Sequence, residues 1–209
     1  MIRNILFDLG GVFIELTREE SIRRFELLGV HDAGALLDPY KQEGIFLALE
    51  SGKYSKEGFT ERVNKEYGLA LKPEQIRHAL EGFVVKMQDW KFDFIEQELP
   101  EEIHLLLVSN TNAFVWEEAE AGHLLKNGRP ISSYFEHVTT SYEAGICKPE
   151  RSIFEKIIEE TKIRPEETLF IDDGPANTAV ARSMGFVTYC PDNGEDWRPL
   201  LRKMLGTRK

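Results

Sequence analysis

The chain has 209 residues, 42% of them hydrophobic, which suits one domain or one domain that carries an insertion. Its formal net charge of -10 and sequence pI of ≈ 5.1 argue against the basic surface that binding to nucleic acid or to an anionic membrane requires. We therefore expect a small-molecule partner, and an anionic one would need a local positive site.

The two cysteines, Cys147 and Cys190, show no metal-ligand spacing, and we expect both to be free thiols. No apolar run is long enough to span a membrane. The N-terminus lacks the basic region and the small-residue cleavage site of a signal peptide. The sequence therefore predicts a cytoplasmic protein, and we expect it to be a monomer.

The first predicted element is a buried strand over residues 2–7, which ends at Asp8 and is followed by a turn at Gly10 and Gly11. Residues 15–86 then form a block of about four predicted helices, and no strand signal interrupts it. The helix signals are a capping box of Thr17 and Glu20, an N-cap at Ser55, a first-turn proline at Pro73, and a further short helix between Pro39 and Gly52.

Strands and helices alternate through the rest of the chain. The predicted strands lie at residues 105–108, 137–139, 168–171 and 186–190, and the predicted helices begin at Pro149 and Pro175. Such alternation is typical of a parallel sheet with helices on both faces. We predict a doubly wound, Rossmann-like α/β core made of residues 1–14 and 87–209, with an inserted all-helical cap at residues 15–86.

Polar side chains follow three of the predicted strands. Asp8 ends the first strand, Ser109 and Asn110 end the second, and Asp172 and Asp173 end a third. In open parallel sheets, ligands bind outside the carboxyl ends of the strands, so these groups should converge on one crevice. Each of these residues taken alone would be an ordinary turn or helix cap. Their joint occurrence at three strand ends favours a functional site.

Three carboxylates close together repel one another, and a hard divalent cation relieves that repulsion. Carboxylate, carbonyl and water oxygens are the ligands that Mg²⁺ prefers. A phosphate group could then bind, because the cation and Lys148 would neutralise its charge and Ser109 could donate a hydrogen bond. A carboxylate such as Asp8 can attack phosphorus and form an aspartyl-phosphate. The sequence therefore predicts Mg²⁺-dependent hydrolysis of a small phosphorylated substrate.

Four segments in this order resemble the motifs of the haloacid dehalogenase-like hydrolase superfamily. They are Phe7-Asp8-Leu9-Gly10-Gly11-Val12, Ser109-Asn110-Thr111, Lys148-Pro149-Glu150, and Phe170-Ile171-Asp172-Asp173 with Asn177 four residues on. The resemblance covers essentially the whole chain, because the helical block sits where that superfamily places its first type of cap. The form of the motifs is similar to the branch that contains bacterial α-D-glucose-1-phosphate phosphatase, which suggests a sugar phosphate as substrate.

The resemblance implies a role for each matching residue. Asp8 is the implied nucleophile and a metal ligand, and Ser109 is the implied phosphate donor with the Asn110 amide nearby. Lys148 is implied to bridge the nucleophile and the phosphate. Asp173 is implied to bind Mg²⁺ directly, and Asp172 directly or through water. The backbone carbonyl of Gly10 is implied to be a further metal ligand.

Gly10 departs from the superfamily's phosphatases, which usually carry a second Asp at this position. That side chain protonates the leaving group and activates water, and general acid–base help of this kind contributes roughly 10²–10⁴-fold in rate. The departure leaves three interpretations open: substrates with good leaving groups, a proton from another residue or from water, or a feeble catalyst.

Two further hypotheses come from the same residues. A 2-haloacid dehalogenase would use the same Asp8 nucleophile without a metal, although the pair Asp172 and Asp173 counts against it. A non-catalytic protein that binds phosphorylated metabolites would explain Gly10. Within the cap, the segment from Glu43 to Ser55 is predicted to face the site, and it includes Glu50 and Lys53.

Overall fold

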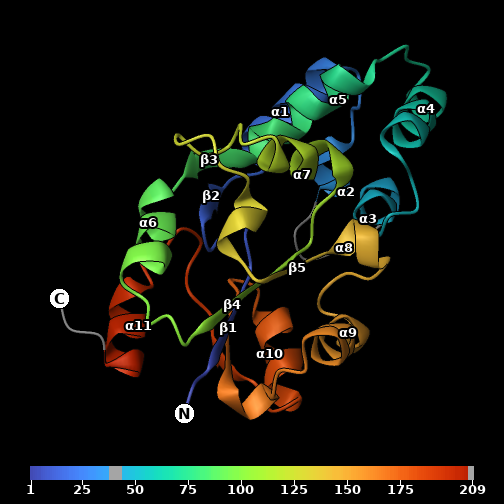
Figure 1. Ribbon diagram of the computed structural model, residues 1–209. Helices are drawn as coiled ribbons and strands as arrows, with labels where there is room; N and C mark the ends of the chain where they lie inside the picture. The colour runs from blue at the N-terminus through green and yellow to red at the C-terminus, as the bar shows by residue number, and fades with distance from the viewer. Residues whose placement is uncertain (38–43, 207–209) are drawn as a thin grey trace.

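The computed structural model describes residues 1–37 and 44–206 and contains a parallel sheet of five strands in the order β5-β4-β1-β6-β7 (Figure 1). The strands are β1 (Asn4–Phe7), β4 (His104–Ser109), β5 (His137–Thr140), β6 (Thr168–Ile171) and β7 (Val187–Tyr189). The order reverses direction at β1, which has β4 on one side and β6 on the other. This topology confirms the predicted doubly wound α/β core.

The register of the three central strands fixes where their carboxyl ends lie. Phe7 pairs with Leu107 on one side and with Ile171 on the other. All three strands run parallel, so the residues just beyond these positions share one edge of the sheet. Asp8, Ser109 and Asp172 therefore lie at that edge, as the sequence predicts.

Helices cover both faces of the sheet because its strands are apolar on both sides. One face of the sheet packs on α6 (Asp89–Gln97), α7 (Ala113–Glu120) and α11 (Arg198–Leu205). The opposite face packs on α9 (Arg151–Thr161) and α10 (Pro175–Ser183). Neighbouring residues of β1 face opposite layers: Phe7 packs on the side of α6, α7 and α11, and Leu6 packs on the side of α9 and α10. The short helix α8 (Ser141–Ala144) follows β5 directly.

The inserted block forms a second apolar cluster above the sheet in Figure 1, which Phe114 of α7 joins from the core. Its helices are α1 (Glu19–Leu27), α2 (Ala33–Leu36), α3 (Gly44–Glu50), α4 (Lys56–Tyr67) and α5 (Pro73–Leu80). Phe25, Phe46 and Phe59 pack edge to face in its centre. Ser55 caps α4 by accepting a hydrogen bond from the Gly58 amide, and Pro73 begins α5; both signals are confirmed.

The insertion departs from the sequence prediction at its two ends. β2 (Ile14–Leu16) and β3 (Val84–Met87) pair as an antiparallel ribbon, where no strand was expected within residues 15–86. Three and four residues are too few for a period of two to stand out, and only the tertiary structure brings the two segments together. The ribbon carries both chain connections between the sheet and the helices.

Two details of the predicted helices were wrong, the cap at Thr17 and the start at Pro149. The four helices predicted in the insertion are present among its described residues, and α2 is an additional one whose four residues are too few to show a helical period. Thr17 does not cap a helix: α1 begins at Glu19, and the Thr17 hydroxyl bonds the Glu19 carboxylate instead. The helix expected at Pro149 begins at Arg151. The predicted helix between residues 39 and 52 is α3 from Gly44 on, and residues 39–43 lie outside the described chain.

A loop near the C-terminus holds the chain where it leaves the sheet for the ribbon. Asn193 accepts a hydrogen bond from the Leu16 amide (3.0 Å) and donates one to the Leu16 carbonyl (2.8 Å). The Gly194 amide bonds the Gly11 carbonyl at 2.7 Å, and the Trp197 indole bonds the Val12 carbonyl at 2.9 Å. Four contacts between distant parts of the sequence therefore fix residues 11–16.

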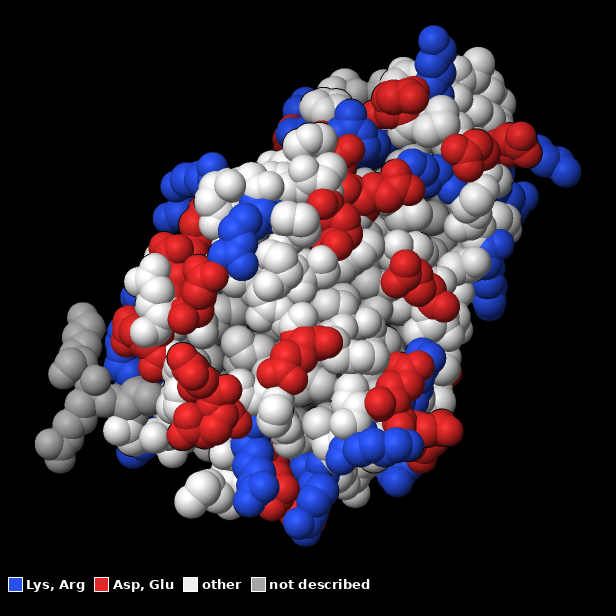
Figure 2. Space-filling view, in the orientation of Figure 1, with Lys and Arg blue, Asp and Glu red and all other residues white. Residues whose placement is uncertain are grey.

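The surface shows acidic and basic side chains side by side on the face drawn in Figure 2, without a continuous basic stripe on that face. Among the described residues, none of the helices combines the length and the apolar character needed to cross a bilayer.

Asn193→Ala removes both hydrogen bonds to the Leu16 backbone. We expect the free energy of unfolding to fall by about 1 kcal/mol, because each of these exposed hydrogen bonds contributes modestly. Urea unfolding of the variant beside wild type measures the difference. Asp192→Ala, at the exposed neighbouring side chain, is the matched control and should leave the midpoint unchanged. An equal loss of stability in both variants would contradict a stabilising role for the two hydrogen bonds of Asn193.

Candidate active site

Asp8 lies just past the end of β1 and is 8% exposed. Its Oδ1 accepts hydrogen bonds from the Leu9 amide (2.7 Å) and from Lys148 Nζ (2.8 Å). Both of these donors bind the same carboxylate oxygen. The arrangement fixes the plane of the carboxylate and presents Oδ2 as the oxygen available for chemistry.

Asp172 and Asp173 follow β6 but have different surroundings. Asp172 is fully buried, and its Oδ1 accepts hydrogen bonds from the Gly174 amide (2.7 Å) and from Asn177 Nδ2 (2.9 Å). Its Oδ2 faces Lys148 Nζ at 2.7 Å. Asp173 is only partly buried and lines the neighbouring cavity. Asp172 is therefore held by protein groups, while Asp173 faces the space where a ligand could bind.

Lys148 links the two strand ends through its buried ammonium group. Its Nζ lies 2.8 Å from Asp8 Oδ1, 2.7 Å from Asp172 Oδ2 and 3.1 Å from the Val108 carbonyl oxygen. The Asn110 carboxamide holds the lysine backbone from both sides: it donates to the Lys148 carbonyl (2.9 Å) and accepts from the Lys148 amide (2.8 Å). The Asn110 side chain thus positions Lys148, and the hydroxyl of buried Ser109 lines the cavity beside it.

The charges of the site do not balance without a cation. Burial raises the pKa of Asp8 well above its usual range, Lys148 lowers it, and Asp172 and Asp173 raise it again. Burial, together with the Asp172 carboxylate, raises the pKa of Asp173 to about 6. Burial lowers the pKa of Lys148, but Asp172 and Asp8 together outweigh that effect and the net shift is upward. One ammonium thus faces three carboxylates.

The donor set fits a magnesium ion. One carboxylate oxygen from each of Asp8, Asp172 and Asp173 lies within 4.8 Å of the other two. Hard oxygen ligands in such a cluster suit Mg²⁺, which also keeps several water ligands. Gly11 lets the chain pass beside Asp173, because a Cβ on Gly11 would lie 2.0 Å from Asp173 Oδ2, at a φ of +67° that favours glycine.

Gly10 lines the cavity, and Leu16 fills the space that a side chain at position 10 would occupy. A Cβ built on Gly10 would lie 2.8 Å from Leu16 Cδ1, which is closer than carbon atoms pack. Asn193 holds the Leu16 backbone, so a side chain at position 10 would have to be accommodated by rotation of the leucine side chain. The loss of an acidic side chain at position 10 is therefore matched by an apolar neighbour.

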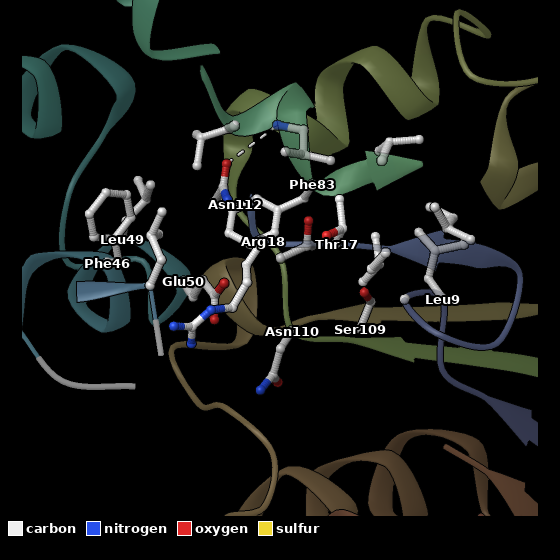
Figure 3. Close-up of a pocket in the computed structure, with 18 of the residues that line it drawn as sticks. Leu9, Thr17, Arg18, Phe46, Leu49, Glu50, Phe83, Ser109, Asn110 and Asn112 are labelled. Carbon is white, nitrogen blue, oxygen red and sulfur yellow. Dashed lines mark hydrogen bonds between the residues drawn. The ribbon is translucent and has the colours of Figure 1, made fainter. Parts of the chain in front are cut away.

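A cavity of about 610 Å³ lies between the carboxyl edge of the sheet and the helical insertion. Ser109, Asn110 and Asp173 line its sheet side, and Arg18 and Glu50 are among the lining residues from the insertion (Figure 3). Within the predicted cap segment, Phe46, Leu49 and Glu50 line the cavity while Lys53 does not, and Glu43 lies outside the described chain. The Arg18 guanidinium also reaches the Gly34 carbonyl, at 3.4 Å.

Residues 2–185 match the family model of haloacid dehalogenase-like hydrolases. The chain belongs to this family, and it is an enzyme. It is 38% identical over 207 residues to a D-ribitol-5-phosphate phosphatase of Bacteroides thetaiotaomicron, covering 99% of this chain and 100% of that one. The predictions of a phosphatase-type hydrolase and of Mg²⁺ as cofactor are confirmed at the level of the family.

Two solved structures match the whole fold. A HAD-like hydrolase of Porphyromonas gingivalis superimposes with a TM-score of 0.94 at 47% identity and covers 100% of both chains. A HAD-family enzyme of Bacteroides thetaiotaomicron, crystallised with magnesium and inorganic phosphate, superimposes with a TM-score of 0.87 at 35% identity. That match covers 97% of this chain and 100% of the other.

Three residues at the site have no role predicted from the sequence. Asn177 bonds both oxygens of Asp172, and its place in the fourth motif was the available signal. Leu16 and Asn193 carried no such signal, because one is an ordinary apolar residue and the other lies 177 residues further along the chain. Only their approach to Gly10 and to each other gives them a role.

Protons compete with Mg²⁺ for this site. The folded-state pKa of Asp173, about 6, lies above the usual 3.8, so ionisation of this carboxyl destabilises the metal-free fold as pH rises towards 6. Binding of the metal requires the ionised form, so its affinity should increase with pH. We expect the Mg²⁺ dissociation constant to be at least about threefold weaker at pH 5 than at pH 7.5, by titration calorimetry. Equal affinities would contradict the assignment.

Gly10→Asp tests the packing against Leu16. The added carboxylate has to displace the leucine, and we expect the free energy of unfolding to fall by about 1–3 kcal/mol. Leu16→Ala in the same chain makes room, so the double variant should lose less than the sum of the two single losses. A thermal-unfolding cycle of the four proteins measures this coupling. Simple additivity would show that Leu16 does not restrict position 10.

Proposed function

We propose that this enzyme is a Mg²⁺-dependent phosphatase that hydrolyses small organic phosphate monoesters through an aspartyl-phosphate on Asp8. The observation that carries the proposal is the buried ammonium of Lys148, which bonds both Asp8 and Asp172. Their chain neighbours Leu9 and Asp173 line the cavity. This pairing holds the Asp8 carboxylate in one orientation, which supports its assignment as the nucleophile.

The metal would be held by Asp8, Asp173 and the Gly10 carbonyl. Asp172 has its oxygens engaged by Lys148, Asn177 and the Gly174 amide, so we assign it to holding Lys148 and to binding the metal only through water. When bound, Mg²⁺ neutralises the charge of the phosphate and of the clustered carboxylates.

In the first step, Asp8 Oδ2 attacks phosphorus while the bond from phosphorus to the leaving oxygen breaks. The alcohol departs, and the phosphoryl group is left on Asp8. Lys148 balances the negative charge through both the carboxylate and the phosphate, and the Ser109 hydroxyl donates a hydrogen bond to a phosphate oxygen. In the second step, water attacks the same phosphorus, which releases inorganic phosphate and restores the Asp8 carboxylate.

The leaving oxygen has to collect a proton, and position 10 has no side chain to supply it. Leu16 fills the corresponding space. We propose that a water molecule supplies this proton as the alcohol departs.

The helical insertion, residues 15–86, is proposed to act as a cap over the core of residues 1–14 and 87–209. It contributes both apolar and charged groups to the cavity, which suits a short hydroxylated carbon chain. A sugar or sugar-alcohol phosphate is the proposed substrate class. The D-ribitol-5-phosphate phosphatase supports this class, and the similarity to the glucose-1-phosphate phosphatase branch remains a prediction. The monomeric state and the cytoplasmic location also remain predictions.

Two competing functions can be separated from this one. A dehalogenase has no need for clustered carboxylates, and it would release chloride from 2-haloacids without Mg²⁺. A non-catalytic phosphometabolite-binding protein would bind beryllofluoride but turn over nothing in a broad panel of phosphate esters. Hydrolysis that requires Mg²⁺ excludes both.

Asp8→Asn removes the proposed nucleophile. We expect kcat to fall by at least about 10³-fold, because the covalent route is lost, and EDTA should abolish wild-type activity in the same way. Phosphate release from a panel of sugar and sugar-alcohol phosphates measures both effects. Asp93→Asn, an exposed carboxylate on α6, is the matched control and should keep full activity. Retention of full activity by Asp8→Asn would sink the proposal.

A further inference from the structure

Ser141 joins the phosphate side of the site to the helical insertion. It is the first residue of α8, directly after β5, and it is fully buried. Its Oγ lies 2.9 Å from the Thr111 amide, 2.7 Å from the Glu50 carbonyl oxygen and 3.1 Å from the Thr111 carbonyl oxygen. Thr111 follows the strand end that carries Ser109, and Glu50 is the last residue of α3. One hydroxyl therefore contacts backbone atoms from both sides of the cavity.

The hydroxyl has only one hydrogen to donate. Its oxygen accepts the hydrogen bond from the Thr111 amide, so the hydrogen has to choose between the Glu50 and Thr111 carbonyls. The Glu50 carbonyl is the nearer acceptor when the insertion rests on the core. If the insertion moves away, the hydroxyl can turn to the Thr111 carbonyl and stays paired. The contact can therefore open without leaving a buried hydroxyl unsatisfied.

The same segment of the insertion approaches the core very closely two residues further on, at Gly52. A Cβ on Gly52 would lie 2.0 Å from the Tyr142 carbonyl oxygen, at a φ of +68°. Only glycine permits this approach. On the neighbouring helix, Lys56 pairs with Glu117 of α7. The loop after α3 is thus seated on the residues that follow β5.

The buried thiol of Cys147 also lies against the Ser141 hydroxyl. Burial raises its pKa to about 11, so it stays a neutral thiol at ordinary pH. A neutral sulfur is a weak acceptor and does not displace the carbonyl oxygens.

We propose that Ser141 is a positioning residue that couples the phosphate-binding loop to the insertion by a reversible hydrogen bond to the Glu50 carbonyl. Phosphate bound beside Thr111 fixes the Thr111 backbone, which holds Ser141 in place to accept the loop after α3. The consequence is that phosphate binding closes the cavity on the side of Glu50. The inference rests on the proposed function, since it needs phosphate to bind beside Ser109.

Hydrogen exchange tests the coupling in the full-length protein, with Mg²⁺ and inorganic phosphate as probes. Peptides over residues 47–54 report the insertion, and peptides over residues 109–116 report the phosphate side. In wild type, phosphate should slow exchange in both. In Ser141→Ala, phosphate should still slow exchange in residues 109–116, but residues 47–54 should no longer respond. Without ligand, residues 47–54 should exchange about two- to tenfold faster in the variant than in wild type.

Two further variants separate coupling from general stability. Gly52→Ala pushes the loop off Tyr142 while leaving the bond between Ser141 and Thr111 in place, and it should uncouple residues 47–54 in the same way. It also supplies the test if Ser141→Ala fails to fold. Thr168→Val removes another fully buried hydroxyl, which bonds Asn4 and Arg164 at the opposite end of the sheet, and should leave the phosphate response of residues 47–54 intact.

The outcomes are distinct. A phosphate response in residues 47–54 that persists in Ser141→Ala and Gly52→Ala, or that is missing in wild type while residues 109–116 respond, overturns the inference. Failure of phosphate to protect either segment in wild type counts against the proposed function, and the ligand-free comparison then decides. Equal ligand-free exchange of residues 47–54 in wild type and Ser141→Ala would overturn the coupling.

Discussion

The buried ammonium of Lys148 is the contact on which the site depends. It lies between Asp8 after β1 and Asp172 after β6, and the carboxamide of Asn110 after β4 holds its backbone. One side chain thus ties three strand ends together. A lysine buried to this degree is stable only with partners of opposite charge, and carboxylates this close together need a cation. The strand order brings these groups together, and their charges are compensated partly by Lys148 and partly by a bound cation.

Several contacts around Lys148 hold the backbone of the core against that of the insertion. Asn193 clamps Leu16, Gly11 makes room for Asp173, and Ser141 bridges Thr111 and Glu50. Each contact joins a loop of the core to the chain that leads into or belongs to the insertion. These polar contacts add to the apolar packing of the insertion against Phe114 and Val115 of α7. Local opening of the polar contacts beside the cavity would suit a site that has to admit substrate and release product.

Leu16 determines the surroundings of Gly10. A glycine two residues after the nucleophile could have left an open space for water or for another acid. The Leu16 side chain borders that space and makes this wall of the cavity apolar. The chemistry proposed for this enzyme therefore relies on charge stabilisation by Lys148 and the metal more than on a side chain that transfers a proton.

The sequence by itself determined the class of fold and the residues at the strand ends. Asp8, Ser109 and Asp172 each follow a strongly apolar run, and the carboxyl ends of parallel strands must share an edge. Only the tertiary structure decided which side chains meet. Asn110 bonds the Lys148 backbone, Leu16 packs against Gly10, and Ser141 bonds the Glu50 carbonyl. The tertiary structure also decided the ribbon of β2 and β3. These contacts join residues that are far apart in sequence. Side-chain periodicity and local propensity describe only neighbouring residues, so they cannot predict such contacts.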